Sequence, residues 1–254
     1  MLIDFVASVR AALEPSFVGA YLTGSLALGD FDAGTSDIDI IVVTDGELPA
    51  SVVAGLDRLH TRFRASGSLW APRLEAAYVP LNALHIDVPP TALFPQVEKD
   101  REFGLYPVES GWVMQLCTLR EHDLALAGPD PRSLIAPIAP DDVRRASAAH
   151  AVTWAQQARH DPAWLTWVHC SEHQVFVVLA LCRMLYSLHT DRVTSKPKAA
   201  GWMLEATGSR WAELVRRAME GNQGKGVVSD REVEETVTLI DYVAQQYQQW
   251  LESH

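Results

Sequence analysis

The sequence predicts two domains of different class, an α/β (α+β) domain with a mixed sheet over residues 1–139 and an all-α domain over residues 140–254. Short apolar, β-prone runs alternate with helical spacing up to about position 128, whereas no convincing strand follows position 141. A proline-rich segment over residues 128–140 separates the two patterns. With 254 residues, 48% of them hydrophobic, the chain can bury one large or two modest cores.

The first domain begins with an amphipathic helix from Met1, because Asp4 and the lack of a basic start argue against a signal peptide. The apolar run 17–22 indicates a buried strand that ends in the turn Thr23-Gly24-Ser25, and a helix is expected to open over 26–28. The remaining expected elements are an amphipathic helix over 51–66 and strands over 37–43, 73–79, 84–88 and 124–127.

The second domain shows helical spacing throughout. Asp141 and Asp230 are candidate N-terminal caps, since Asp is a preferred capping residue. The expected helices cover 141–158, 172–189, 198–206, 209–220 and 230–251.

Charge and cysteine content exclude several classes of protein. A net charge of −11 argues against nucleic-acid binding, which needs a basic surface, and favours attraction of cationic molecules. The three cysteines form no Cys-x-x-Cys pair, so a disulfide framework or zinc site is not expected. The longest apolar run, residues 175–182, is too short to span a bilayer. We expect a cytoplasmic monomer with no membrane segment.

Asp37 and Asp39 are the residues with the clearest chemical meaning. Side chains at i and i+2 of a strand share a face, and two like charges held that close need a cation between them. Mg²⁺ fits, because it is bound through one or two carboxylates plus substrate phosphates. Gly24 and Ser25 offer a hydroxyl and the first N–H groups of a helix, which suit a polyphosphate. An Asp-x-Asp alone is commonly a solvated strand end, but this spacing between two apolar strands favours a metal site.

A third carboxylate is expected from Glu75 or from Asp87. In the strand expected over 73–79, Glu75 lies on the face opposite Leu74 and Tyr78. The alternative to a catalytic role is that Glu75 is a solvated surface residue on an exposed face. The residues alone leave both candidates open.

Together these motifs resemble the nucleotidyltransferases of the DNA polymerase β superfamily, and within it the aminoglycoside (3'')(9)-O-adenylyltransferases, which modify streptomycin and spectinomycin. The resemblance implies a nucleotidyltransferase domain that moves AMP from ATP to a hydroxyl of a small molecule and releases pyrophosphate. The similar stretches are 24–29, 36–39, 73–75, 119–129 and 183–187, with Lys196 and Trp202.

The resemblance also implies roles for individual residues. It favours Glu75 over Asp87 as the third carboxylate and general base, because Glu75 lies in the matching Arg-Leu-Glu motif. Arg183, on an otherwise apolar helix, and Lys196 match cationic residues that contact ATP, although surface solvation is their ordinary alternative. The implied metal-binding and catalytic residues are Asp37, Asp39 and Glu75, and the implied ATP-binding residues are Gly24, Ser25, Ser36, Arg183 and Lys196.

For the acceptor, the resemblance implies an aminoglycoside or aminocyclitol antibiotic. Trp164 matches a tryptophan that lies against the drug, although the three tryptophans within 154–167 are also typical of helix packing. His169 and His173 stand where the family has two acidic residues, and Glu172 can substitute if the register shifts by one. The alternatives are a lincosamide, a metabolite or a protein side chain as acceptor, or a non-catalytic binding module, against which the three carboxylates argue.

Overall fold

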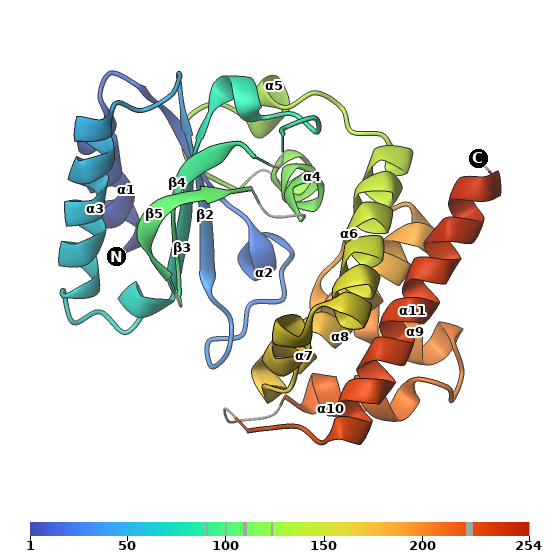
Figure 1. Ribbon diagram of the computed structural model, residues 1–254. Helices are drawn as coiled ribbons and strands as arrows, with labels where there is room; N and C mark the ends of the chain where they lie inside the picture. Colours follow the sequence, from blue (N-terminus) through green and yellow to red (C-terminus); the bar gives the residue numbers. More distant parts are fainter. Residues whose placement is uncertain (90, 100, 109–110, 123, 222–225, 254) are drawn as a thin grey trace. The chain divides into compact units, whose positions relative to one another are not determined.

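The computed structural model describes residues 1–89, 91–99, 101–108, 111–122, 124–221 and 226–253. The chain divides into two compact units, Met1–Ile138 and Ala139–His254, beside the boundary expected from the proline-rich segment. The described part of the first unit is a sheet with helices on both faces, and that of the second is helical apart from one isolated bridge (Figure 1). The predicted fold class is confirmed. No described helix is both long and apolar enough to cross a membrane.

The sheet has the strand order β5-β4-β3-β2-β1-β6. Its central pair, β2 and β3, is parallel, and every other neighbouring pair is antiparallel, so the sheet is mixed as predicted. The strands are β1 Phe17–Leu22, β2 Ile38–Thr44, β3 Leu74–Pro80, β4 Leu93–Glu98, β5 Arg101–Pro107 and β6 Ala125–Ala127.

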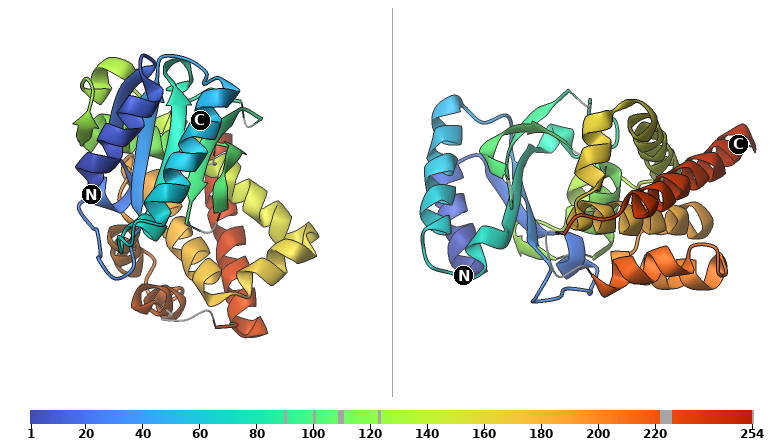
Figure 2. Two further views of the ribbon diagram at one scale, coloured as in Figure 1. Left: turned by 90° about the vertical axis from the view of Figure 1, so that its left-hand side faces the viewer. Right: turned by 60° about the horizontal axis from the view of Figure 1, so that its bottom comes forward.

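Alternation along the strands separates two hydrophobic clusters. Ile38 and Ile40 pack with α1 (Leu2–Leu13) and α3 (Ala50–Arg64), which lie side by side on one face (Figure 2). Ile41 and Val43 pack with α4 (Trp112–His122) on the other face. The short elements of this unit are α2 Gly24–Ala27, η1 Ala71–Arg73, η2 Leu81–Ala83 and α5 Pro131–Leu134.

Three expectations for the first unit were wrong or incomplete. Residues 84–88 form turns after η2 rather than a strand. The hairpin of β4 and β5 was not predicted, because Pro95 and Gly104 interrupt its sequence and β5 is largely exposed. The helix α4 was not predicted either, because its buried residues occupy most of its circumference instead of one stripe.

The described helices of the second unit pack around α8. Each of the other five helices contacts α8 directly. Buried residues along the length of α8 form the centre of the hydrophobic core. The helix α7 was not predicted as a separate element. The helices are α6 Pro140–His160, α7 Pro162–Val168, α8 Ser171–Thr190, α9 Lys196–Ala206, α10 Ala212–Glu220 and α11 Asp230–Ser253.

The two capping predictions were wrong. Asp141 lies inside the first turn of α6, where a negative charge still favours the helix dipole. At α11 the cap is Ser229, whose N–H donates to Glu232 Oε2 at 2.9 Å while the Glu232 N–H donates to Ser229 Oγ at 3.4 Å. This reciprocal pair is a capping box. Hydrogen bonds from Ser229 lower the pKa of Glu232.

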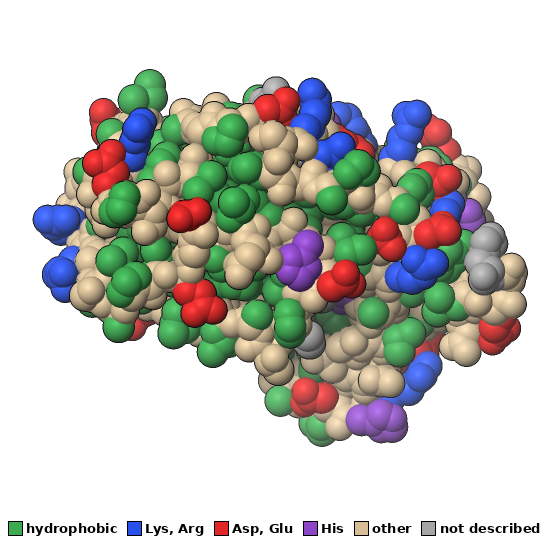
Figure 3. Space-filling model, turned by 90° about the horizontal axis from the view of Figure 1, so that it is seen from above, with side chains coloured by type: hydrophobic (Ala, Val, Ile, Leu, Met, Phe, Trp, Pro, Cys, Tyr) green, Lys and Arg blue, Asp and Glu red, His purple; other side chains and the backbone are tan. Residues whose placement is uncertain are grey.

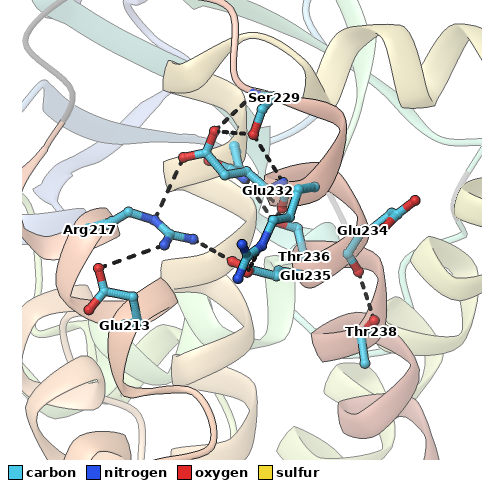
Figure 4. Close-up of polar contacts among 10 residues, drawn as sticks. Glu213, Arg217, Ser229, Glu232, Glu234, Glu235, Thr236 and Thr238 are labelled. Carbon is cyan, nitrogen blue, oxygen red and sulfur yellow. Dashed lines mark hydrogen bonds and ion pairs between the residues drawn. The ribbon is translucent and has the colours of Figure 1, made fainter.

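Arg217 links α10 to the start of α11 (Figure 4). Its guanidinium lies 2.5 Å from Glu235 Oε2, 3.7 Å from Glu232 Oε1 and 3.8 Å from Glu213 Oε1. Three carboxylates around one half-exposed guanidinium form a network rather than an isolated surface pair.

Replacing Arg217 should therefore destabilise the helical unit. We expect Arg217→Met to lower the free energy of unfolding by about 1 kcal/mol, the upper range for exposed pairs, because several partners lose their cation together. Arg216→Met, an exposed neighbour on the same helix, is the control and should change little. Urea denaturation measures both, and equal stability of the two variants would show that the network contributes nothing.

His60 is a buried titratable residue of the first unit. It is 3% exposed, its Nε2 lies 2.7 Å from the Tyr78 hydroxyl, and its ring stacks on Phe103. Burial, and then the charge of Arg64, lower the pKa of His60 to about 4. An unfolded histidine titrates near pH 6.5, so below that pH the unfolded chain binds a proton that the folded chain does not.

Stability should consequently fall as the pH drops from 6.5 towards 4. We expect this histidine to contribute up to about 3 kcal/mol of that loss. His60→Gln should show a shallower pH dependence of the unfolding free energy in this window, measured by urea denaturation at several pH values. His160→Gln, at an exposed position, is the control. A slope unchanged by His60→Gln would contradict the prediction.

Candidate active site

The parallel register of β2 and β3 places two of the predicted carboxylates side by side. Asp39 and Glu75 are direct partners across the two strands, and both belong to the face that carries α2 and α4. Neighbouring strands lie about 4.8 Å apart, so two side chains on the same face at partnered positions are within mutual reach. Residues from two distant segments of the chain therefore form one acidic site where both strands begin.

Asp37 lies just before β2, and Arg73 holds the loop that leads to it. The Arg73 Nε lies 3.7 Å from Asp37 Oδ1, its Nη1 donates to the Ala33 carbonyl at 2.7 Å, and its Nη2 donates to the Ser36 carbonyl. The Ser36 hydroxyl accepts from the Asp32 N–H at 3.0 Å. The predicted ATP-binding Ser36 thus shapes the loop that presents Asp37.

Gly24 packs directly against Asp39. Its φ is +60°, and a Cβ at this position would lie 1.9 Å from Asp39 Oδ2, so only glycine fits. The Thr23 N–H donates to the Asp39 carbonyl at 3.0 Å. The Gly24-Ser25 turn is in this way fixed beside the acidic site.

The helix after this turn, α2, is too short to have a substantial macrodipole. It was expected to open over 26–28, but α2 begins at Gly24 and has four residues. The macrodipole contribution is therefore small. The first N–H groups of α2 and the Ser25 hydroxyl remain as donors for an anion.

Burial of its carboxyl, and then the negative charges of Asp39, Asp37 and Glu98, raise the pKa of Glu75 to about 8. The Lys99 N–H donates to Glu75 Oε1 at 3.1 Å and acts in the opposite direction. Such crowding of carboxyl groups is relieved by a cation.

Within the described ranges, no group of three His, Cys, Asp or Glu side chains is placed so that it could hold a metal ion by itself. Mg²⁺ seldom needs one, because it is usually bound through one or two carboxylates, water and substrate phosphates. One or two of the carboxylates Asp37, Asp39 and Glu75 would therefore be enough for a Mg²⁺ ion that arrives with a triphosphate.

Asp87, the competing third carboxylate, lies in an exposed turn that follows the far end of β3. Glu75 stands at the start of the same strand. The length of β3 from Glu75 to its far end at Pro80 is about 16 Å, at about 3.3 Å per residue. The placement favours Glu75 as the partner of Asp39.

In the second unit, Trp164 belongs to an aromatic cluster formed by Trp154, Trp164, Trp167, His173 and Phe176. Trp164 itself is buried, with 9% exposed, and packs against the other two tryptophans. Trp167 and Phe176 are each 38% exposed, and Trp167 stacks on His173 with ring centroids 4.2 Å apart. The surface that a ligand can touch is thus mainly Trp167 and Phe176.

The predicted cations lie next to this cluster. Lys196 Nζ is 4.6 Å from the Phe176 ring centroid. Burial, and then the charge of Arg183, lower the pKa of His150 to about 4, and His150 meets Trp154 edge-on at 4.3 Å. Glu172 is exposed in the first turn of α8.

Two contributors to the acidic site were not assigned a role from the sequence. Arg73 stands two residues before Glu75 in the motif, and that spacing was its only signal. No sequence signal indicated the Lys99 amide, because its hairpin was not predicted and every residue except proline has a backbone N–H.

Comparisons with known proteins agree with both units. Residues 9–98 match the family described as nucleotidyltransferase domain, and residues 133–246 match the C-terminal domain of aminoglycoside adenylyltransferase. Spectinomycin 9-adenylyltransferase of Campylobacter jejuni is 24% identical over 97% of this chain and 94% of its own length. Aminoglycoside (3'') (9) adenylyltransferase of Escherichia coli is 24% identical over 88% of this chain and 84% of its own length.

A solved structure shows the same fold. Spectinomycin adenyltransferase AAD(9) from Enterococcus faecialis, described with ATP and spectinomycin, superposes with a TM-score of 0.70 at 17% identity. The match covers 97% of this chain and 98% of that one.

Proposed function

Because the chain belongs to the aminoglycoside adenylyltransferase family of nucleotidyltransferases, we propose that it moves AMP from ATP to a hydroxyl of an aminoglycoside or aminocyclitol antibiotic. One observation carries the proposal. The parallel pairing of Asp39 with Glu75, against the Gly24-Ser25 turn, assembles carboxylates and anion donors at one place. A binding module would have no use for a buried carboxyl group that can act as a base.

In the proposed reaction the acceptor oxygen attacks the α-phosphorus of ATP, and the bond from this phosphorus to the bridging oxygen breaks. The products are the adenylylated acceptor and pyrophosphate. Asp37 and Asp39 would hold Mg²⁺, which when bound supplies positive charge to the triphosphate and to the attacking oxygen. The Ser25 hydroxyl and the first N–H groups of α2 bind the terminal phosphates, and Ser36 orders the loop beside them.

Glu75 takes the proton that the acceptor hydroxyl loses. A general base must lie within ~2.6–3.2 Å of the donor oxygen, or reach it through one water. A general base is most efficient when its pKa is close to the working pH. This suits Glu75, because burial and the charge of Asp39 raise the pKa of its carboxyl group. Positioning and electrostatics then supply most of the rate, as in phosphoryl transfer generally.

Arg183 and Lys196 of the helical unit are proposed as cationic ligands of ATP, since ionised donors make the stronger hydrogen bonds to phosphate.

We propose that the enzyme works as a monomer in the cytoplasm, where ATP is available. It has no nucleic-acid partner in this proposal. The net charge of −11 supports the absence of a nucleic-acid partner, and on the face drawn in Figure 3 the basic side chains are interspersed with acidic and hydrophobic ones.

The proposed acceptor is a cationic antibiotic of the streptomycin or spectinomycin type. The names of the relatives, the net charge of −11 and the exposed rings of Trp167 and Phe176 support it. Trp164 packs against the ring of Trp167, and Glu172 is the proposed anionic contact. A lincosamide, a metabolite or a protein side chain remains an alternative outcome of the test.

Glu172→Gln should weaken binding of the acceptor and reduce its salt dependence while leaving ATP binding unchanged. Salt screens an exposed ion pair over a Debye length of about 8–10 Å, so loss of this pair should reduce the salt dependence of binding. Because Trp164→Ala would also empty core volume, Trp167→Ala is the cleaner test of the aromatic contact.

Calorimetric titration of streptomycin and spectinomycin at two salt concentrations, with ATP and Mg²⁺ present, measures both effects. Glu220→Gln, an exposed acidic residue on α10, is the control. Failure of the wild-type protein to bind either drug would remove the antibiotic from the proposal but leave adenylyl transfer to another acceptor.

A further inference from the structure

The turn between β4 and β5 contacts the proposed general base. The Lys99 N–H donates to Glu75 Oε1 at 3.1 Å. This donor belongs to the backbone, so its direction depends on where the turn is held. A backbone amide that points at a carboxylate fixes one of its two oxygens and thereby orients the other.

Arg64, the last residue of α3, holds this turn. Its Nη2 donates to the Glu98 carbonyl at 2.6 Å and to the Arg101 carbonyl at 3.2 Å. Glu98 and Arg101 are partners in the antiparallel register, so one guanidinium nitrogen joins both strands beside Lys99. Arg64 is half-buried, and α3 also contacts β5.

The turn needs such an anchor because it lies at the edge of the sheet. The strand β5 is one of the two edge strands, and all of its residues are exposed or half-buried. Edge hairpins with few buried contacts open locally at low free-energy cost. Arg64 adds to the hairpin ladder and to the exposed ion pair between Arg101 and Glu98, which also join the two strand ends beside Lys99.

We propose that Arg64 is a positioning residue of the active site: it fixes the β4–β5 turn so that the Lys99 amide holds the Glu75 carboxylate in the orientation that accepts the acceptor's proton. The catalytic part of this inference rests on the proposed function. Misplacement of a reacting group by about 1 Å can cost on the order of 10²-fold in rate, so a residue remote from the substrate can act in this way.

Amide hydrogen exchange tests the connection without any substrate. In ¹⁵N-labelled protein, Arg64→Met should speed exchange of the Lys99 amide by about 10-fold or more, the worth of one hydrogen bond to an ionisable acceptor. Glu75→Ala should do the same from the other side of the bond. Arg62→Met, an exposed arginine on the same helix, is the matched control and should leave the exchange unchanged. Unchanged exchange in Arg64→Met would overturn the inference.

Kinetics tests the catalytic consequence. Arg64→Met should lower kcat by about 10–100-fold while KM for ATP stays the same, because the phosphate donors are untouched. Arg64→Lys, which keeps a cation but not the planar fork, should recover part of the rate. A purely structural residue would instead lower the melting temperature with kcat per folded molecule unchanged.

A double-mutant cycle completes the test. Lys99→Pro removes the N–H donor, and the double variant Arg64→Met/Lys99→Pro should lose no more activity than Lys99→Pro alone, since both act through one hydrogen bond. Additive losses would overturn the inference. If the wild-type protein transfers AMP to no acceptor, the proposed function fails, whereas the amide exchange still decides whether Arg64 positions Glu75.

Discussion

Asp39→Asn is expected to abolish adenylyl transfer while the protein remains folded. Asn has the shape of Asp, so it fits against Gly24 as the native side chain does, but it removes the charge that would hold Mg²⁺ between β2 and β3. Removing that charge also relieves repulsion with Glu75, so the ligand-free variant should melt at or above the wild-type temperature.

Pyrophosphate release and thermal denaturation measure the two parts of this prediction. Asp4→Asn, an exposed acidic residue of α1, is the control and should keep full activity. A folded Asp39→Asn protein that turns over at a near-wild-type rate would show that the metal has been assigned to the wrong carboxylates.

Glu75→Gln should remove the base and leave nucleotide binding intact. We expect the rate to fall by roughly 10²–10⁴-fold, the usual contribution of general-base catalysis. The Gln side chain keeps an oxygen that can accept the Lys99 N–H, so the local geometry should survive. Single-turnover rates and calorimetric titration with ATP separate the loss of chemistry from any loss of binding.

Asp87→Asn is the matched variant for this experiment. Asp87 lies in an exposed turn beyond the far end of β3, and its replacement should leave the rate unchanged. If Asp87→Asn shows the large loss and Glu75→Gln does not, the third carboxylate is Asp87.

The sequence was sufficient to predict the elements that carry the acidic site. Alternation of Asp37 and Asp39 with Ile38 and Ile40 indicated a strand with one polar face at its start, and the structure has β2 there. The pairing of Asp39 with Glu75 could not be predicted in the same way. Register between two strands depends on packing across the whole sheet, and no pattern within either strand specifies it.

Other parts of the site depend on contacts that local patterns do not encode. The orientation of Glu75 depends on a turn in an edge hairpin whose strands contain Pro95 and Gly104, so neither strand shows clean alternation. Arg64 looks like an ordinary basic residue in the last turn of a helix. The burial of Trp164 against Trp154 and Trp167 depends on how the helices pack, which spacing alone does not determine.

The most direct test of the account is the mass of the acceptor after incubation with the purified protein, ATP and Mg²⁺, with pyrophosphate release followed in parallel. The account predicts that spectinomycin or streptomycin gains the mass of one adenylyl group, with one pyrophosphate released for each drug molecule modified. Folded, ATP-binding protein that yields no adenylylated product with either drug, with a lincosamide or with any other acceptor tested would contradict it.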